Sequence, residues 1–392
     1  MTLPAAEAPR LPKILSGLAL AAMCLFAMAG QAAAVTLKLT AQLDSSVQYD
    51  DNIYLTNTAK QSSTRYTVAP KATVSATSDQ NTASLTASGN IERFSGGSGR
   101  DVNDYGVSFS DSYQASDRLT FGVNAGYSRQ SLLSSELKDT GLILPGYNRR
   151  AINAGGSLGY ALDETDQISL SGSFNDNRYN NALLSNYRSY QTSVGWQKRL
   201  SDRVSLTTAV SGGIENPQNT ALIGRSHYVQ GTVGVDYALS EVASIGANAG
   251  AYFFDQAGPL SGQVGVTAGA HASTRSEFTT VSLDVNHGLA PSGVGAFVRS
   301  TSVSLSVSER LAEHLYVDGG ADIRFDKTQG SVSFALDRKY YDGTASLRWD
   351  FAHFFSFDID YRHLRQRIVG GSLWADENRI GARLVMYSEP RE

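Results

Sequence analysis

The chain has 392 residues, of which 41% are hydrophobic and only 18% are charged, and its formal net charge is −4. The charged fraction is below the roughly 25% of a typical soluble domain, yet no stretch after residue 34 approaches the roughly 20 apolar residues of a membrane-spanning helix. This excludes a helical membrane protein. The net charge is small and there is no cluster of basic residues, so the sequence shows no nucleic-acid-binding surface. A single Cys excludes a scaffold held by disulfides and a metal site built from several thiolates.

Residues 1–34 have the pattern of a cleaved signal peptide. Arg10 and Lys13 precede an apolar run over residues 14–29, and the small residues Ala32–Ala34 fit a signal-peptidase site. An N-terminal anchor helix is the alternative, although the apolar run is short and the chain turns polar after Val35. We expect an exported mature domain over residues 35–392.

A period-two alternation of apolar and polar residues runs through this mature chain. Between Leu119 and Gln130 apolar residues alternate with small or polar ones, which predicts a strand with one apolar and one polar face. The same alternation recurs at residues 168–174, 204–210, 229–237, 245–253, 279–285, 301–307, 315–325, 341–351 and 380–386. These segments suit the roughly ten residues with which a tilted strand crosses a bilayer.

Short and long connections alternate between the predicted strands. Short turns are expected at residues 78–81, 115–118, 163–167, 201–203, 240–243 and 353, and longer connections at 57–64, 96–103, 131–149, 180–186, 215–225, 255–262, 289–296, 326–339 and 369–377. Short periplasmic turns and longer outside loops are typical of outer-membrane barrels. We therefore predict an all-β fold, a single transmembrane antiparallel up-and-down barrel of about 18 strands within a range of 16–20. It would lie in the lipid of a bacterial outer membrane with both termini in the periplasm.

A strand signal for barrel assembly is expected close to the C-terminus. Asn378, Gly381, Leu384 and Met386 fit the polar-x-x-Gly-x-x-apolar-x-apolar form that the barrel assembly machinery recognises. The match departs from the commonest form, because the polar residues 388–392 follow Tyr387 where an aromatic terminus is usual. The pattern predicts that machinery as a partner, and a chance match is the alternative.

If the apolar positions face lipid, the opposite parity faces an interior wide enough for an aqueous channel. Over the middle of the chain that face consists mostly of Ser, Thr, Asn and Gln. Toward the C-terminus it carries both charges, and we call this set the charged wall: Asp318, Asp322, Arg324, Asp342, Arg348, Asp350, Asp358, Asp360, Arg362, Arg379 and Arg383.

The charged wall has two interpretations. Opposite charges on neighbouring strands can pair and stiffen the wall. Alternatively, its arginines form a ladder for anionic groups on a passing solute, since charged side chains that line a pore set its ion preference. Both can hold, because a paired arginine keeps spare donors. Lys71 and Asp284 are lone charges elsewhere on the same face.

Three neighbouring oxygen-bearing residues, Asp50, Asp51 and Asn52, lie within the first predicted strand, residues 43–56. They could hold Ca²⁺, but neighbours in an extended strand point to opposite faces and the spacing of a calcium loop is absent. A strand-end turn, in which these side chains bond the local backbone, is the favoured interpretation. We expect no metal site.

These residues also carry a family resemblance. Residues 43–56 read LDSSVQYDDNIYLT, and the core formed by Tyr49, Asp50, Asp51, Asn52 and Ile53 resembles the opening strand of outer-membrane β-barrel porins found with exopolysaccharide secretion systems. The regular hairpins of the mature chain are similar in length and strand number to those proteins. The resemblance implies a barrel through which a polysaccharide leaves the cell, with a periplasmic polysaccharide-export protein as partner.

Enzyme motifs lack their structural context. Residues 155–159 match G-x-S-x-G, but they lie within an alternating strand and no helix follows. The six His residues are scattered, without an H-E-x-x-H pair. His271 could still meet a Ser across the lumen, and only proximity would show it. We expect no enzyme and no cofactor.

Three functions therefore remain. The favoured one is passive export of a polysaccharide along a wall of weak hydroxyl and amide contacts, and the alternative is a general or solute-selective porin for small hydrophilic molecules. The third is an outer-membrane lipase or deacylase. The width of the narrowest ring separates the first two, because a folded-in loop, for which residues 131–149 with Leu142–Pro145 are the candidate, would constrict a solute porin.

Overall fold

The computed structural model describes residues 35–97, 101–133, 135–137, 140–182, 184–218, 224–256, 262–292, 296–328, 337–368 and 373–389. The signal peptide expected over residues 1–34 lies outside them. The strands are β1 (Thr36–Asp50), β2 (Ser63–Thr77), β3 (Asn81–Phe94), β4 (Val102–Ser116), β5 (Leu119–Ser131), β6 (Asn148–Ala161), β7 (Asp166–Tyr179), β8 (Tyr187–Arg199), β9 (Val204–Pro217), β10 (Ser226–Ala238), β11 (Ala243–Gln256), β12 (Gln263–Arg275), β13 (Thr279–Ser292), β14 (Ala296–Ala312), β15 (Leu315–Thr328), β16 (Arg338–Ala352), β17 (Phe355–Ile368) and β18 (Ala375–Tyr387).

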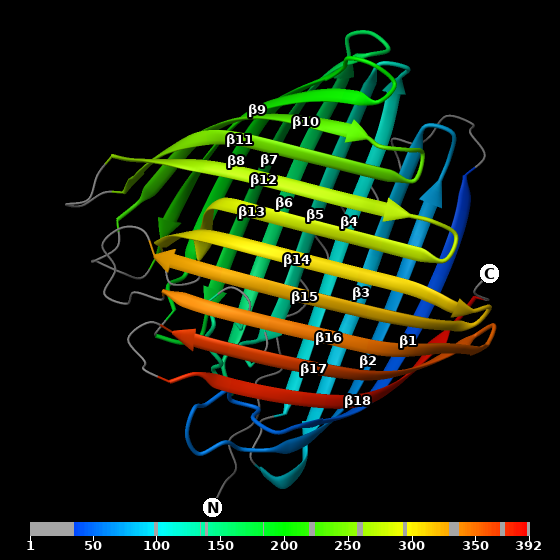
Figure 1. Cartoon of the computed structure of the whole chain (residues 1–392), viewed down its shortest axis with the longest axis vertical. Helices are drawn as coiled ribbons and strands as arrows, with labels where there is room; N and C mark the ends of the chain where they lie inside the picture. The colour runs from blue at the N-terminus through cyan, green and yellow to red at the C-terminus, as the bar shows by residue number, and fades with distance from the viewer. Residues whose placement is uncertain are drawn as a thin grey trace, which may run out of the picture.

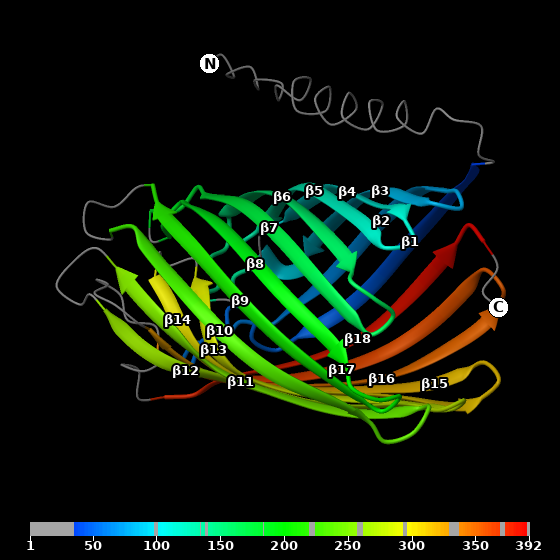
Figure 2. The same cartoon turned by 90° about the horizontal axis from the view of Figure 1, so that it is seen from above.

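The strands form one closed antiparallel barrel. Each strand pairs with the next in sequence, and β18 pairs with β1, so that the 18-stranded sheet has no free edge (Figures 1 and 2). Closure satisfies the backbone hydrogen bonds that edge strands would leave exposed. The predicted fold, an up-and-down barrel of 18 strands, is confirmed. No helix among the described residues has the length and apolarity to cross a membrane.

The exterior of the barrel is apolar. Large aliphatic residues point outward in the middle of their strands, among them Val210, Val233 and Val266, which are 59%, 55% and 65% exposed. Since side chains alternate along a strand, the residues of opposite parity face the lumen. A continuous apolar surface of this extent is typical of contact with a membrane or another protein.

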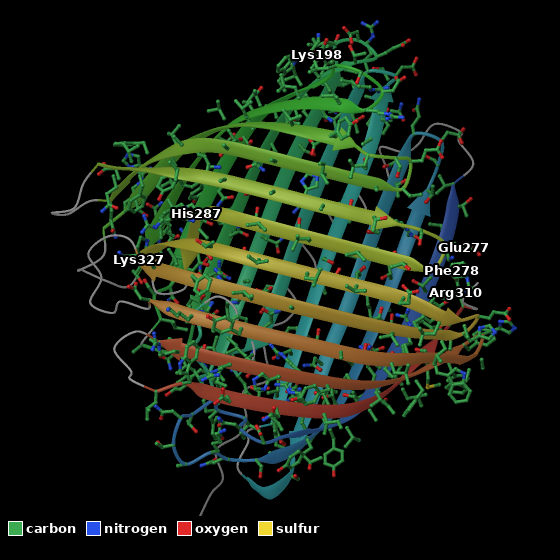
Figure 3. The ribbon with its side chains drawn as sticks, in the orientation of Figure 1. Lys198, Glu277, Phe278, His287, Arg310 and Lys327 are labelled. Atoms are coloured by element: carbon green, nitrogen blue, oxygen red, sulfur yellow. The ribbon has the colours of Figure 1, made fainter. Side chains whose placement is uncertain are left out.

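Connections at the two ends of the barrel differ in length. Turns of two to four residues join β2 to β3 and every second strand thereafter, whereas the other end carries the longer connections. Figure 3 shows Glu277, Phe278 and Arg310 at the short-turn side and His287 and Lys327 at the opposite side. The predicted alternation is therefore present, and we call the two ends the short-turn end and the long-loop end.

The strands have 13 to 17 residues, more than the crossing of a bilayer requires. Most of the predicted longer connections are therefore wrong in extent. The clearest cases are residues 289–292, which belong to β13, residues 326–328 and 338–339, which belong to β15 and β16, and residues 215–217, which belong to β9. The physical reason is that backbone pairing continues beyond the apolar belt, where the side chains turn polar while the hydrogen bonds persist.

The end of the β13–β14 hairpin lies over the lumen. β13 pairs with β12 only as far as His287, and beyond that point Leu289 and Phe297 pack against aromatic residues of β10 and β11. The ring centroid of Phe297 lies 5.5 Å from that of Tyr228 and 5.2 Å from that of Phe254. Tyr228 and Phe254 lie at lumen-facing positions of their strands, so the hairpin narrows the barrel on this side. We call Tyr228, Tyr252, Phe254 and Phe297 the aromatic cluster.

β1 and β18 meet at a seam that closes the barrel (Figure 1). Beyond β1, the carboxylate of Asp51 accepts hydrogen bonds from the backbone N–H and side-chain amide of Asn378, both at 2.7 Å. The side-chain amide of Asn52, which is fully buried, donates to the carbonyl oxygens of Thr56 and Asp376, both at 2.8 Å. These residues thus form a turn whose side chains bond the local backbone and also join the two ends of the sheet.

Candidate transport constriction

The connection between β5 and β6 folds into the lumen. Residues 132–147, which we call the inner loop, leave the wall at Ser131 and return at Asn148, and positions 134, 138 and 139 lie outside the described residues. Leu132, with Leu142 and Leu144, packs with Tyr179, Leu184 and Tyr187 of the β7–β8 region and with Ile368 of β17. The loop therefore bridges two parts of the ring that are far apart in strand order.

A second apolar contact joins the inner loop to β16–β18. Leu137 and Ile143 pack against Tyr340, Leu364 and Ala375, together with Leu55 of the β1–β2 connection. Tyr340 and Leu364 are 1% and 0% exposed, so the loop shields this part of the wall from water. The burial stabilises the docked position by roughly 25 cal/mol for each Å² of apolar surface removed from water.

Two polar side chains of the far wall hold the loop backbone. Arg338 donates from Nη1 to the carbonyl oxygen of Leu137 at 2.5 Å, and Gln366 donates from Nε2 to the carbonyl oxygen of Gly141 at 2.9 Å. Arg338 is itself held by Asp326, whose Oδ2 accepts from Nη2 at 2.8 Å and from Nε at 3.0 Å. An ordered ion pair, rather than a flexible surface contact, thus anchors the loop.

Gly141 makes this close docking feasible. Its φ is +77°, and a Cβ placed there would lie 2.7 Å from Cδ of Arg338. Only glycine adopts such a backbone conformation without steric cost. The position combines a left-handed turn with direct contact to the anchoring arginine.

A cavity of about 120 Å³ lies between the inner loop and the wall, and we call it the eyelet. Leu133, Leu137 and Ile143 line it from the loop, and Ile53, Phe94 and Tyr340 add further apolar surface. Its polar lining consists of three arginines and three acids: Arg65, Arg362, Arg379, Asp50, Asp342 and Glu377. A solute that passes here meets apolar side chains on one side and balanced charges on the other.

All five arginines of the predicted charged wall point into the lumen and form ion pairs. Arg362 contacts Asp342 at 2.6 Å, and Arg379 contacts Glu377 at 2.6 Å and Asp50 at 3.3 Å. The remaining N···O distances are Arg324–Asp326 2.8 Å, Arg348–Asp318 3.7 Å and Arg383–Asp358 3.1 Å. Ion pairing is thus general along the wall. The Nε atoms of Arg348 and Arg379 are buried and have no hydrogen-bond partner among the described residues.

Asp322, Asp350 and Asp360 are the remaining acids of the charged wall. Asp322 accepts a hydrogen bond from Ser304 at 3.2 Å, and Asp360 accepts one from Gln48 at 3.4 Å. Asp350 lies two positions after Arg348 in β16, has the same parity and therefore faces the lumen. Only Arg362, Arg379 and Asp342 of the predicted set line the eyelet, and the others lie elsewhere along the wall.

The proposed assembly signal divides between the two faces of β18. Leu384 and Met386 are 37% and 41% exposed on the lipid side, whereas Gly381 faces the lumen, where a Cβ would lie 2.6 Å from Gln48 and 2.9 Å from Asp360. Asn378 binds Asp51 at the seam. The four residues therefore have local structural roles in addition to any recognition by assembly machinery, which stays a prediction.

Several residues of the constriction were missed by the sequence analysis. Arg338 fell within the predicted loop 326–339, and Arg65, Gln366 and Glu377 were not singled out although they have lumen parity. Their parity was a usable signal, because each lies two or four residues from a lumen-facing position. The sequence gives no signal that these residues converge in space, since that depends on which strands face each other across the closed barrel.

The enzyme motifs have no catalytic arrangement in the described part of the chain. Residues 155–159 lie within β6, without a strand-to-helix elbow. His271 contacts Asp236 through Nε2 at 3.2 Å. No hydrogen bond between His271 and a serine is present among the described residues, so the proximity that a Ser–His pair requires is not seen there.

The polar remainder of the lumen forms a broad cavity of about 540 Å³ on the opposite wall. Its lining comes from β9 to β15 and consists mostly of hydroxyl and amide side chains, to which His287 and Arg324 add an imidazole and a guanidinium group. The hydroxyl and amide members are Thr207, Thr208, Gln230, Thr232, Asn248, Thr267, Asn286, Ser300 and Ser302. This surface offers a solute many weak hydrogen bonds, and its described residues form no cluster of like charges that would bind an ion tightly.

Comparisons with known proteins give a family model over part of the chain and distant likenesses among solved structures. A family model described as "Putative MetA-pathway of phenol degradation" matches residues 30–192. Among solved structures, the chain is similar to Pseudomonas aeruginosa OccK2 (OpdF), solved in complex with glucuronate, with 14% identity, coverage of 90% of this chain and 98% of that chain, and a TM-score of 0.49. For Pseudomonas aeruginosa OprD the values are 12%, 90%, 94% and 0.45. No curated protein matches.

Proposed function

We propose that this protein is a solute-selective channel of a bacterial outer membrane, through which small hydrophilic molecules diffuse passively. The observation that carries the proposal is the inner loop, which crosses the lumen and is held by Arg338 and Gln366. A loop that docks on the far wall narrows the path at one level and leaves the strands intact. Selection by size and polarity then occurs at the eyelet.

The membrane location rests on the exterior. Outward-facing aliphatic residues such as Val210 and Val266 would be costly in water and are favourable against acyl chains. With short turns in the periplasm and long loops outside, both termini lie on the periplasmic side. Recognition of β18 by the assembly machinery belongs to the same proposal.

Polysaccharide export is the competing interpretation, with its periplasmic export protein as partner. A long polymer needs a continuous wide path, and a docked loop with buried anchors obstructs one. Export would therefore require the loop to undock, which breaks the contacts of Arg338 and Gln366 and exposes Leu137 and Leu364 to water. The docked loop thus favours the solute channel.

The eyelet also suggests what it selects. Its arginines and acids are equal in number, so simple ions of either sign meet a nearly neutral ring. Leu133, Leu137 and Ile143 oppose these charges, which suits small polar molecules with a modest apolar face. The polar wall beyond supports passage through exchangeable hydrogen bonds.

Removal of the inner loop tests the proposal. We would replace residues 133–146 by a short Gly/Ser linker, and compare the variant with the wild-type protein in planar bilayers and in liposomes swollen with sugars of increasing size. We expect a higher single-channel conductance and a larger size limit in the variant. A matched Gly/Ser replacement of the β10–β11 turn, residues 239–242, which lies at the short-turn end, should leave both unchanged. Equal conductance with and without the inner loop would contradict the proposal.

A second experiment separates solute transport from export in cells. Deletion of the gene should reduce uptake of small hydrophilic solutes and leave the mass of extracellular polysaccharide unchanged. Loss of polysaccharide with normal solute uptake would instead support export.

A further inference from the structure

Three neighbouring strands bring oxygen atoms together on the lumen face near the long-loop end. Glu215 of β9 lies directly opposite Ser226 of β10, and Ser226 lies opposite Gln256 of β11. Residues in such register have Cβ atoms about 4.5–5.5 Å apart. All three have the parity opposite to the outward-facing Val210, Val229 and Phe253, so their side chains project from the wall to the inside.

These side chains are buried and lack hydrogen-bond partners. Glu215, Ser226 and Gln256 are 0%, 1% and 4% exposed. Both carboxylate oxygens of Glu215, Oγ of Ser226 and Oε1 of Gln256 have no partner in the described part of the chain, including one another. Four adjacent acceptor oxygens are thus withdrawn from water without compensation.

Such an arrangement is unfavourable unless another group enters it. An ionised carboxylate taken out of water needs a cation or several donors, and its burial alone costs several kcal/mol as an order of magnitude. Among the described residues, no Lys, Arg or His forms an ion pair with Glu215, although such pairs are frequent along the charged wall. Nothing among the described residues neutralises this carboxylate, and a proton or a cation from solution would do so.

We infer that Glu215, Ser226 and Gln256 bind a calcium ion. Carboxylate, hydroxyl and amide oxygens are ligands of hard cations, and the set has no sulfur or imidazole that would select zinc or copper. Ca²⁺ accepts a bidentate carboxylate and irregular geometry, whereas Mg²⁺ demands a near-ideal octahedron. The described residues contain no group of three or more His, Cys, Asp or Glu suited to a metal. This cluster is of a different kind, because it combines one carboxylate with a hydroxyl and an amide oxygen.

A single carboxylate implies modest affinity. We expect a dissociation constant in the range of roughly 10⁻⁴–10⁻³ M, which is that of extracellular calcium modules. Tyr228, two positions along β10 from Ser226, belongs to the aromatic cluster. Bound Ca²⁺ would therefore hold β9, β10 and β11 together beside the point where the β13–β14 hairpin enters the lumen.

Calcium binding to the full-length barrel folded in detergent tests the inference. Titration calorimetry with CaCl₂ should show one saturable site in the wild-type protein and weaker binding of Mg²⁺. Glu215→Gln keeps the volume of the side chain and removes its charge, so we expect it to abolish the site. Asp284→Asn, which removes one lumen carboxylate from a different place, should bind Ca²⁺ as the wild type does.

Thermal unfolding supplies a second readout. Ca²⁺ should raise the unfolding temperature of the wild-type protein and of Asp284→Asn, because a ligand that binds only the folded state stabilises it. It should not raise that of Glu215→Gln, whose folding is checked by its faster migration on unheated gels. Absence of saturable binding in the wild-type protein would identify a proton as the partner and overturn the inference. Equal binding by Glu215→Gln would overturn it as well.

Discussion

Replacement of Gln366 by Met should loosen the inner loop without changing the volume of the wall. The variant loses the hydrogen bond from Nε2 to the carbonyl oxygen of Gly141, which is 2.9 Å long and buried. A buried acceptor left unpaired costs about 1–3 kcal/mol, which the undocked loop avoids by exposing the carbonyl to water. Met also removes Oε1 of Gln366, which is buried without a hydrogen-bond partner among the described residues, and this offsets part of the loss. The ratio of undocked to docked loops should therefore rise, at most roughly 5- to 150-fold, at 1.4 kcal/mol for each factor of ten.

Single-channel recordings measure this ratio. We expect Gln366→Met to spend a larger fraction of time in a state of high conductance, and Gln230→Met, the same change on the opposite polar wall, to behave as the wild type. Arg338→Met should act in the same direction and more strongly, because it also leaves Asp326 without its bidentate partner. If Gln366→Met folds normally and its conductance states match the wild type, the docked loop does not limit the channel.

Three further predictions concern the eyelet, the loop and a turn. Arg362→Ser leaves the eyelet with an excess of one negative charge, and the reversal potential in a KCl gradient should shift toward cation preference; an unchanged potential would make Arg362 a support of the wall only. Gly141→Ala should raise conductance more than Gly262→Ala. Both glycines have φ of +77°, but a Cβ at Gly141 would lie 2.7 Å from Cδ of Arg338, whereas the nearest atom to a Cβ at Gly262 is 3.9 Å away. Equal effects would argue against the contact with Arg338. In the exposed turn after β6, hydrogen bonds from Thr165 and Asp166 lower the pKa of Asp163. The ionised carboxylate stabilises the folded state above its unfolded pKa of about 3.9, and this contribution is lost as the pH falls through the lower pKa of the folded state. In denaturant unfolding, Asp163→Asn should therefore be less stable than the wild type at pH 7 and equally stable at pH 2.

The barrel could be predicted because its signals are local. Period-two alternation determines which side of a strand each residue faces, and the lumen parity of Arg348, Arg362 and Arg379 followed from it. The alternation of short and long connections reveals antiparallel hairpins without knowledge of distant contacts. The positions of the strand ends were predicted less accurately, since strands that stay paired beyond the apolar belt show no apolar alternation there.

The constriction could be predicted only in part. The apolar residues Leu142 and Ile143 indicated that the loop between β5 and β6 might fold inward, but not where it docks. Its anchors, Arg338 and Gln366, are 201 and 225 positions from the carbonyls that they bind. Which strands oppose each other across the lumen depends on strand number and closure, and neither property is encoded in any local window of the sequence.

The contact between Asp51 and Asn378 spans 327 positions of the chain, and it sets the order of events in biogenesis. Synthesis begins at the N-terminus, so β1 emerges long before its second neighbour exists. Until the last strand arrives, the nascent sheet has two unsatisfied borders, each able to recruit a foreign strand. A chain truncated before residue 375 lacks β18 and cannot close the sheet, so we expect it to accumulate as aggregates or be degraded, which immunoblots of cell fractions would detect.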